Sequence, residues 1–95
     1  MTREDIFHAI EANRESIRSL GVRHLGLFGS YARGDQSVSS DIDFLVDPAE
    51  RFSLLDLIAL KHDLEELTGR NVDIVSRRGI SPYLNDDILR QAIPL

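Results

Sequence analysis

One polar segment, Gly29 to Asp43, separates two short apolar runs and constrains the fold more than any other part of the chain. It opens with a Gly-Ser pair, continues through ten residues, and ends in an Asp-Ile-Asp sequence that leads into apolar residues 44–46. In a strand, Asp41 and Asp43 would point to the same face, because successive side chains alternate. Two like charges on one face repel, and solvation, a raised pKa or a bound cation relieves the repulsion. The segment therefore predicts a strand, a loop and a second strand, with a cation carrying nucleotide phosphates beside the acids.

Composition bounds the class of protein. The 95 residues are enough for one small domain, residues 1–95, with a core of its own. The chain has no cysteine, which fits a reducing compartment, and no apolar run approaches the ~18 residues that a membrane span needs. We therefore expect a soluble cytoplasmic protein without a membrane partner. The net charge of −5 argues against nucleic acid as a partner, because nucleic-acid affinity depends on cationic contacts.

Helical spacing and capping residues predict two long helices, over residues 2–19 and 54–68. Each helix has the residues of a capping box and a glycine at its end: Thr2, Asp5 and Gly21 for the first, and Ser53, Asp56 and Gly69 for the second. Asn13 and Arg14 interrupt the apolar stripe of the first helix. The second helix has a broad set of apolar residues that we expect in the core: Leu54, Leu55, Leu57, Ile58, Leu60, Leu64 and Leu67.

Three short apolar runs, 22–28, 42–46 and 72–75, predict strands. Residues 31–34 suggest one helical turn, and residues 35–40 a loop. The fold class is therefore α/β (α+β), a small mixed β-sheet of about three strands packed by helices. Strands one and two should be antiparallel, and strands two and three parallel, because a helix joins them. Four apolar residues of the tail predict a short amphipathic helix near Asn85 that belongs either to the core or to an interface: Leu84, Ile88, Leu89 and Ile93.

This topology places the end of strand one and the starts of strands two and three at one edge of the sheet. Gly29 and Ser30 then lie beside Asp41 and Asp43, and Asp73 joins them from strand three. Carboxylate oxygens suit Mg²⁺, with Mn²⁺ as the alternative, and phosphates can complete the coordination. Two ions held by such acids form the arrangement used for displacement at phosphorus. The sequence therefore predicts a metal-dependent enzyme that acts on nucleotides.

The stretch LFGSYARGDQSVSSDIDFLV, with the later VDIV, resembles the minimal nucleotidyltransferase (MNT) branch of the DNA polymerase beta-like nucleotidyltransferase superfamily. The resemblance covers about residues 1 to 90 and implies a polymerase beta palm-like fold. It implies that Gly29 and Ser30 hold the triphosphate of ATP or another NTP, that Asp41 and Asp43 bind two Mg²⁺ ions, and that Asp73 completes the catalytic one. It also implies an antitoxin that transfers AMP to a tyrosine of a HEPN-domain RNase toxin.

Simpler interpretations stand beside these. Arg33 either contacts a phosphate or is a solvated surface residue, and Tyr31 is expected to pack in the core. The three histidines are expected to be structural or exposed, because no pair has the spacing of metal ligands: His8, His24 and His62. Two rival functions remain. One is an antitoxin that neutralises its toxin by docking alone, and the other is transfer to a small molecule such as an aminoglycoside, which the absence of a second domain disfavours.

Overall fold

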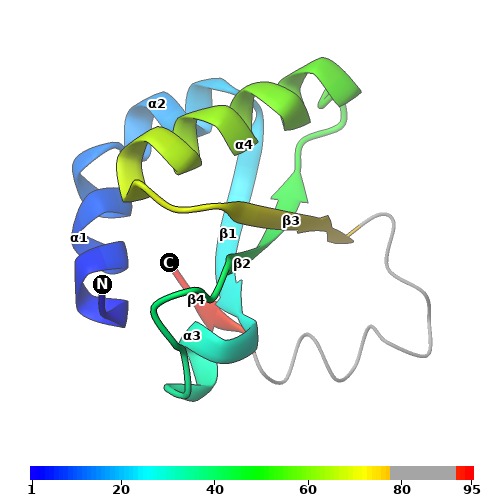
Figure 1. Cartoon of the computed structure of the whole chain (residues 1–95). Helices are drawn as coiled ribbons and strands as arrows, with labels where there is room; N and C mark the ends of the chain where they lie inside the picture. The colour runs from blue at the N-terminus through cyan, green and yellow to red at the C-terminus, as the bar shows by residue number, and fades with distance from the viewer. Residues whose placement is uncertain (78–91) are drawn as a thin grey trace.

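A mixed sheet of four strands, in the order β3-β2-β1-β4, forms the framework of the computed structural model, which describes residues 1–77 and 92–95. The strands are β1 (Val22–Phe28), β2 (Ile42–Pro48), β3 (Val72–Ser76) and β4 (Ile93–Pro94). β1 and β2 are antiparallel and β2 and β3 are parallel, which confirms both predicted pairings. Figure 1 shows α3 at one end of β1 and α2 at the other, so the two ends of the sheet have different surroundings.

The sheet has one strand more than the about three predicted, because Ile93 lies in β4 and not in a helix. β4 pairs with the outer edge of β1, with Ile93 opposite Leu27 and Pro94 opposite Gly26. A strand of two residues is too short for an alternating pattern to reveal it. The other tail residues expected in that helix, Leu84, Ile88 and Leu89, lie outside the described residues.

β2 also runs two residues further than predicted, through Asp47 and Pro48. Among the described residues, the pairing of β2 with β3 runs from Ile42 to Val46, and Pro48 lies two residues beyond it. On the other side Pro48 lies opposite Val22, next to an irregularity in the register. Proline is tolerated in a strand beside such an irregularity, where the regular ladder is already interrupted.

The predicted first helix is in fact two helices, α1 (Arg3–Ala12) and α2 (Arg14–Ser19). The break falls at Asn13, whose Nδ2 donates to the carbonyl oxygen of Ala9 at 2.8 Å. Asparagine competes with helix geometry by bonding to nearby backbone in this way. The capping box at the start of α1 is confirmed, since the backbone N–H of Thr2 donates to the Asp5 carboxylate at 2.9 Å and Asp5 N–H donates to the Thr2 hydroxyl.

Helix α4 (Leu54–Thr68) begins at the predicted capping box of Ser53 and Asp56 and ends at Gly69, which has a φ of +67°. Its apolar residues divide into two sets, so the prediction that all of them are core is wrong. Leu60 and Leu64 are fully buried, and Leu57 and Leu67 pack against the core. The remaining three are exposed, Leu54 by 71%, Leu55 by 77% and Ile58 by 57%. One helix face can contact the sheet, and residues 54, 55 and 58 lie off that face.

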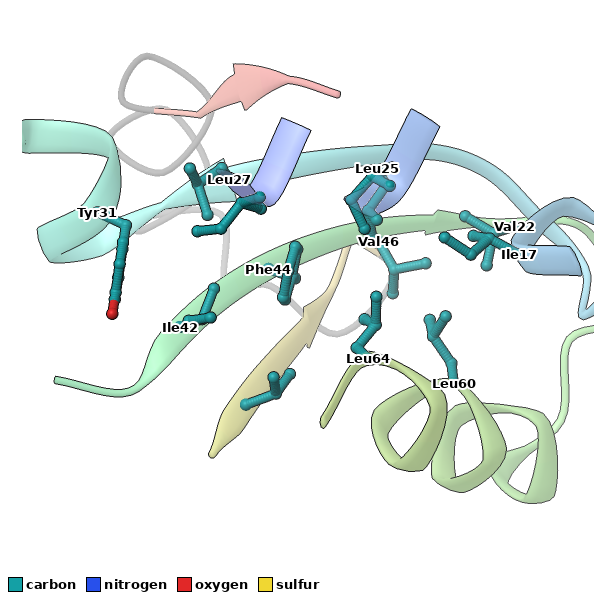
Figure 2. Close-up of a cluster of buried hydrophobic side chains, with 13 residues drawn as sticks. Ile17, Val22, Leu25, Leu27, Tyr31, Ile42, Phe44, Val46, Leu60 and Leu64 are labelled. Carbon is teal, nitrogen blue, oxygen red and sulfur yellow. The ribbon is translucent and has the colours of Figure 1, made fainter. Parts of the chain in front are cut away.

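The core lies between the sheet and the three helices α1, α2 and α4, and Figure 2 shows side chains of both strands and helices meeting there. Tyr31 is 1% exposed, which confirms the prediction that it packs in the core. Within residues 1–77 and 92–95, no helix combines the length and the apolar composition that a membrane span requires.

Candidate active site

The register of the sheet brings the predicted acids to one edge. Phe28, the last residue of β1, lies opposite Asp43, and Asp43 lies beside Asp73 of β3. Asp41 immediately precedes β2. Asp41 and Asp73 are exposed, whereas Asp43 is half-buried between them. Gly29 follows Phe28 directly, so it lies at the same end of the sheet as these acids, which are up to 44 residues further along the chain. The prediction that Gly29 and the acids meet at one end of the sheet is therefore confirmed.

Helix α3 (Gly29–Arg33) is the single helical turn expected after β1. It closes at Gly34, which has a φ of +81°, a left-handed conformation that favours glycine. The Ser30 carbonyl accepts hydrogen bonds from the N–H groups of Gly34, at 2.9 Å, and Asp35, at 3.0 Å. These two backbone hydrogen bonds close the turn, and they fix the position of the Ser30 backbone that carries its side chain.

Gly29 lies against the carboxyl group of Asp43, and a side chain at position 29 would displace that group. Its φ is +72°, and a Cβ built on it would overlap Oδ2 of Asp43 and lie 3.0 Å from its Cγ. The sequence analysis explained Gly29 by the close approach of a phosphate to its backbone. The structure adds a second reason, since the missing side chain gives the Asp43 carboxyl group its space.

The pKa of Asp43 is raised above its ordinary value. Burial is the largest cause, and the negative charges of Asp73 and then Asp41 add to it. The positive charge of Arg33 acts in the opposite direction. The carboxyl group with the greatest need of a positive partner is therefore the central one of the three.

Arg33 projects from α3 toward solvent, with its side chain about half exposed. Its Nε lies 3.2 Å from Oδ2 of Asp35, an exposed pair that contributes little to stability. The role of Arg33 as a phosphate contact stays a prediction, since an exposed side chain fits both interpretations. The structure also places the guanidinium near enough to Asp43 to affect the pKa of that acid.

The chemistry of the donor set fits a hard divalent cation, because the groups at this edge are carboxylates with phosphate ligands expected beside them. Within residues 1–77 and 92–95, no group of three or more His, Asp or Glu side chains is arranged to hold a metal ion. Metal binding by Asp41, Asp43 and Asp73 therefore stays a prediction, in which a nucleotide supplies the missing ligands.

A polar groove of about 800 Å³ includes Asp41 but neither Asp43 nor Asp73 in its lining, and the sequence analysis did not predict it. One wall is the loop 38–41 and the other is the end of α4 with residues 69–71. Arg70 joins the walls, since its Nη1 donates to the carbonyl oxygen of Val38 at 2.5 Å. These two residues are 32 positions apart, and no local pattern marks such a contact.

The three histidines are all exposed, as expected.

Comparison with known proteins agrees with this geometry. The model of the family described as "Nucleotidyltransferase domain" matches residues 10–95. The protein adenylyltransferase MntA of Thermococcus cleftensis is 38% identical over 94 residues, which cover 98% of this chain and 95% of that protein. The solved structure of a protein assigned as a minimal nucleotidyltransferase is 43% identical, with a TM-score of 0.90 over 100% of this chain and 97% of the other. A toxin–antitoxin crystal structure with AMP-PNP contains a chain 26% identical, with a TM-score of 0.71 over 99% of this chain and 72% of that one.

Proposed function

Because this chain belongs to the nucleotidyltransferase domain family, we propose that it transfers AMP from ATP to a hydroxyl group of a partner protein. In this proposal residues 1–95 act as one minimal nucleotidyltransferase domain. The acceptor oxygen forms a bond to the α-phosphorus while the bond to the β-phosphate oxygen breaks. Pyrophosphate leaves, and the hydroxyl proton passes to solvent.

One observation carries the proposal, the placement of the Asp43 carboxyl group. It is half-buried, lies beside Asp73 in the neighbouring strand, and fits against Gly29 where any side chain would displace it. A half-buried acid between two other acids costs stability unless a cation compensates it. Such an arrangement has a reason in an enzyme and none in a protein that only docks.

The residues of this edge then have separate tasks. Gly29 and Ser30 hold the phosphates, Gly29 through the close approach of its backbone and Ser30 through its hydroxyl. This assignment rests on the family, because α3 has only five residues and so short a helix does not indicate an anion site by itself. Asp41 and Asp43 hold Mg²⁺, and Asp73 completes the ligand set. When bound, the metal neutralises charge on the phosphates and lowers the pKa of the attacking hydroxyl. Arg33 contributes positive charge near the same phosphates.

The proposed acceptor is a HEPN-domain toxin, and its tyrosine hydroxyl is the proposed target. Two observations on relatives support a toxin as the acceptor of AMP: one relative is a protein adenylyltransferase, and another is part of a toxin–antitoxin structure with AMP-PNP. The HEPN domain and its tyrosine rest on the family resemblance. The net charge of −5 favours association with a basic protein through electrostatic steering.

The rival function is neutralisation of the toxin by docking alone, and one variant separates the two. Asp41→Ala removes a carboxylate that is exposed and outside the strand, so the fold should survive. Purified protein is incubated with Mg·ATP and the HEPN-domain protein of the neighbouring reading frame, and AMP addition is measured by mass spectrometry. We expect Asp41→Ala to bind the partner and to transfer AMP at least roughly 10²-fold more slowly, the range seen when a charge-stabilising group is lost.

Glu50→Ala is the matched control, since Glu50 is also an exposed acid, in the loop between β2 and α4. It should transfer AMP at the wild-type rate. Full neutralisation of the toxin by Asp41→Ala, at every concentration tested, would favour docking and remove the biological role of transfer.

A further inference from the structure

We propose that Arg70 is a positioning residue of the predicted metal site, because it holds the loop that carries Asp41 against the start of β3. Nη1 of Arg70 donates to the carbonyl oxygen of Val38 at 2.5 Å, across 32 positions of the chain. The inference rests on the proposed function and deepens it, since it gives a task to a residue outside the Gly29–Asp43 motif. Arg70 acts through Asp41 and is not itself a metal ligand.

Asp41 is the least firmly placed of the three acids. Asp43 pairs with residues on both neighbouring strands, and Asp73 pairs with Asp43. Asp41 is exposed and precedes β2, so none of the described strand pairings includes it. The ligands of a working site must be held to within about 0.5 Å. The position of Asp41 therefore depends on how the loop before it is held.

The turn before β3 holds that loop at two points, one on each side of Asp41. Before the acid, Arg70 holds the loop at Val38. After the acid, the carbonyl oxygen of Asn71 accepts a hydrogen bond from the N–H of Ile42 at 3.0 Å. The same turn leads directly into β3, which carries the third acid. The two hydrogen bonds thus fix Asp41 relative to the strand of that third acid.

The outer part of the loop depends on Arg70 alone of these two contacts. The N–H of Ser37 donates to Oγ of Ser40 at 2.8 Å, so the loop turns on itself just before Asp41. Val38 lies on this turn with its side chain 88% exposed, so packing does not hold the turn against the protein. Among the hydrogen bonds of the described residues, only the one from Arg70 joins residues 37–40 to another part of the chain.

The backbone of Arg70 is itself fixed to the end of α4. The Thr68 hydroxyl accepts from the N–H of Arg70 at 3.3 Å and donates to the carbonyl oxygen of Leu64 at 2.7 Å. Thr68 is buried, and the N–H of Gly69 donates to the carbonyl oxygen of Glu65 at 2.8 Å. The guanidinium group therefore reaches the loop from a rigid base.

The charge of Arg70 is not used to neutralise an acid. Among the described residues, no carboxylate forms an ion pair with Arg70, so the Asp41 carboxylate stays available to a cation. A hydrogen bond from a charged donor is stronger than one between neutral groups. Arg70 is therefore suited to holding an exposed loop in water.

Arg70→Ala tests the inference by titration with Mn²⁺ in the absence of nucleotide, followed through the paramagnetic broadening of the backbone N–H signals of the three acids. Loss of a group that orients metal ligands typically weakens metal binding about 10- to 100-fold, and we expect the Kd for Mn²⁺ to rise roughly tenfold. A mere charge effect has the opposite sign, because removal of a positive charge strengthens the binding of a cation. Arg70→Lys keeps a charged donor and should recover part of the affinity.

Arg51→Ala is the matched control, since Arg51 is an exposed arginine in the loop between β2 and α4, and it should bind Mn²⁺ as wild type does. Order parameters from NMR in the metal-free protein give a second readout. They should fall for the N–H groups of residues 38–41 in Arg70→Ala and stay unchanged in Arg51→Ala. The melting temperatures of the two variants should be similar, because the lost hydrogen bond is exposed and an exposed loop opens without global unfolding.

Unchanged or higher affinity of Arg70→Ala for Mn²⁺ would overturn the inference, and so would a loop that keeps its order without the arginine. These readouts do not depend on catalysis. If wild type binds Mn²⁺ and Arg70→Ala loses the affinity and the loop order, but wild type transfers no AMP, the proposed function fails and the positioning role of Arg70 stands.

Discussion

The two ends of the sheet break the ordinary division between apolar interior and polar surface in opposite ways. At the end near α3, the acid Asp43 is half-buried against Gly29. At the end where α4 begins, Leu54, Leu55 and Ile58 are exposed on the surface. The first departure places charge where solvation is poor, and the second places apolar area in water.

The two departures differ in how closely the structure fixes them. Asp43 is held by strand pairing on both sides and lies against Gly29, where a Cβ would overlap its carboxyl group. The exposed residues of α4 are held only by the helix that carries them, beside a shallow groove formed by Pro48, Phe52 and Leu57 with others. A close fit around an unfavourable group indicates a site, whereas loosely held apolar residues indicate only available surface.

The largest expected effect contrasts two leucines of α4. Leu60→Ala should lower the free energy of unfolding by about 2–5 kcal/mol, because Leu60 is fully buried and its loss leaves a cavity. Leu55→Ala should change it by no more than about 0.5 kcal/mol, because Leu55 is 77% exposed. Urea denaturation of both variants measures the contrast. Equal, large losses would mean that something covers Leu55 in solution.

A second contrast concerns two glycines with similar backbone angles. Gly29→Ala and Gly34→Ala both place a side chain at positive φ, which costs about 1–2 kcal/mol. Gly34 has nothing within 4 Å of a new Cβ, whereas at Gly29 the Cβ would overlap the Asp43 carboxyl group and add about 1–3 kcal/mol of overpacking. We expect Gly29→Ala to be the less stable variant and to lose AMP transfer.

Thermal unfolding and the transfer assay together measure this second contrast. Gly34→Ala should keep most of its activity, since only its backbone strain is new. Equal stability of the two variants would show that Asp43 moves aside easily and that Gly29 does not position it.

Much of the fold was predictable because its signals are local. The capping boxes at Thr2 and Ser53, and the glycines Gly21 after α2 and Gly69 after α4, depend on residues close together in the chain, and they are confirmed. The nucleotidyltransferase class was predictable for the same reason, since its motif lies within Gly29–Asp43, and the family match confirms it. The register that adds Asp73 followed from the helical connection between β2 and β3.

The remaining features depend on contacts that the sequence does not mark. β4 has only two residues, and its pairing with Leu27 is decided by the free edge of β1. Helical spacing shows that α4 is apolar, but the sheet covers Leu60 and Leu64 and leaves Leu55 exposed. The groove beside Asp41 depends on the hydrogen bond from Arg70 to Val38. Each of these requires the assembled fold.

The smallest expected effect tests whether the charge of Asp43 lowers the stability of the metal-free protein. Asp43→Asn keeps the shape of the side chain and removes its charge, so the repulsion from Asp73 and Asp41 ends and the penalty for burying an ion disappears. Like charges on neighbouring strands cost roughly 0.2–1 kcal/mol, and we expect a metal-free variant that is stabilised within this range or unchanged. Because its raised pKa makes ionised Asp43 unfavourable for the fold, the gain should appear near pH 7 and vanish in acid, where the wild-type carboxyl group is protonated.

Melting temperatures in EDTA at neutral and acidic pH measure this gain, with Asp35→Asn as the control for removal of an exposed acid in the neighbouring loop. AMP transfer by Asp43→Asn should be lost even though its fold is intact. A clear drop in melting temperature at neutral pH would show that the Asp43 charge stabilises the protein by itself. The half-buried acid would then be part of the framework, and the contrast between the two ends of the sheet would no longer indicate function.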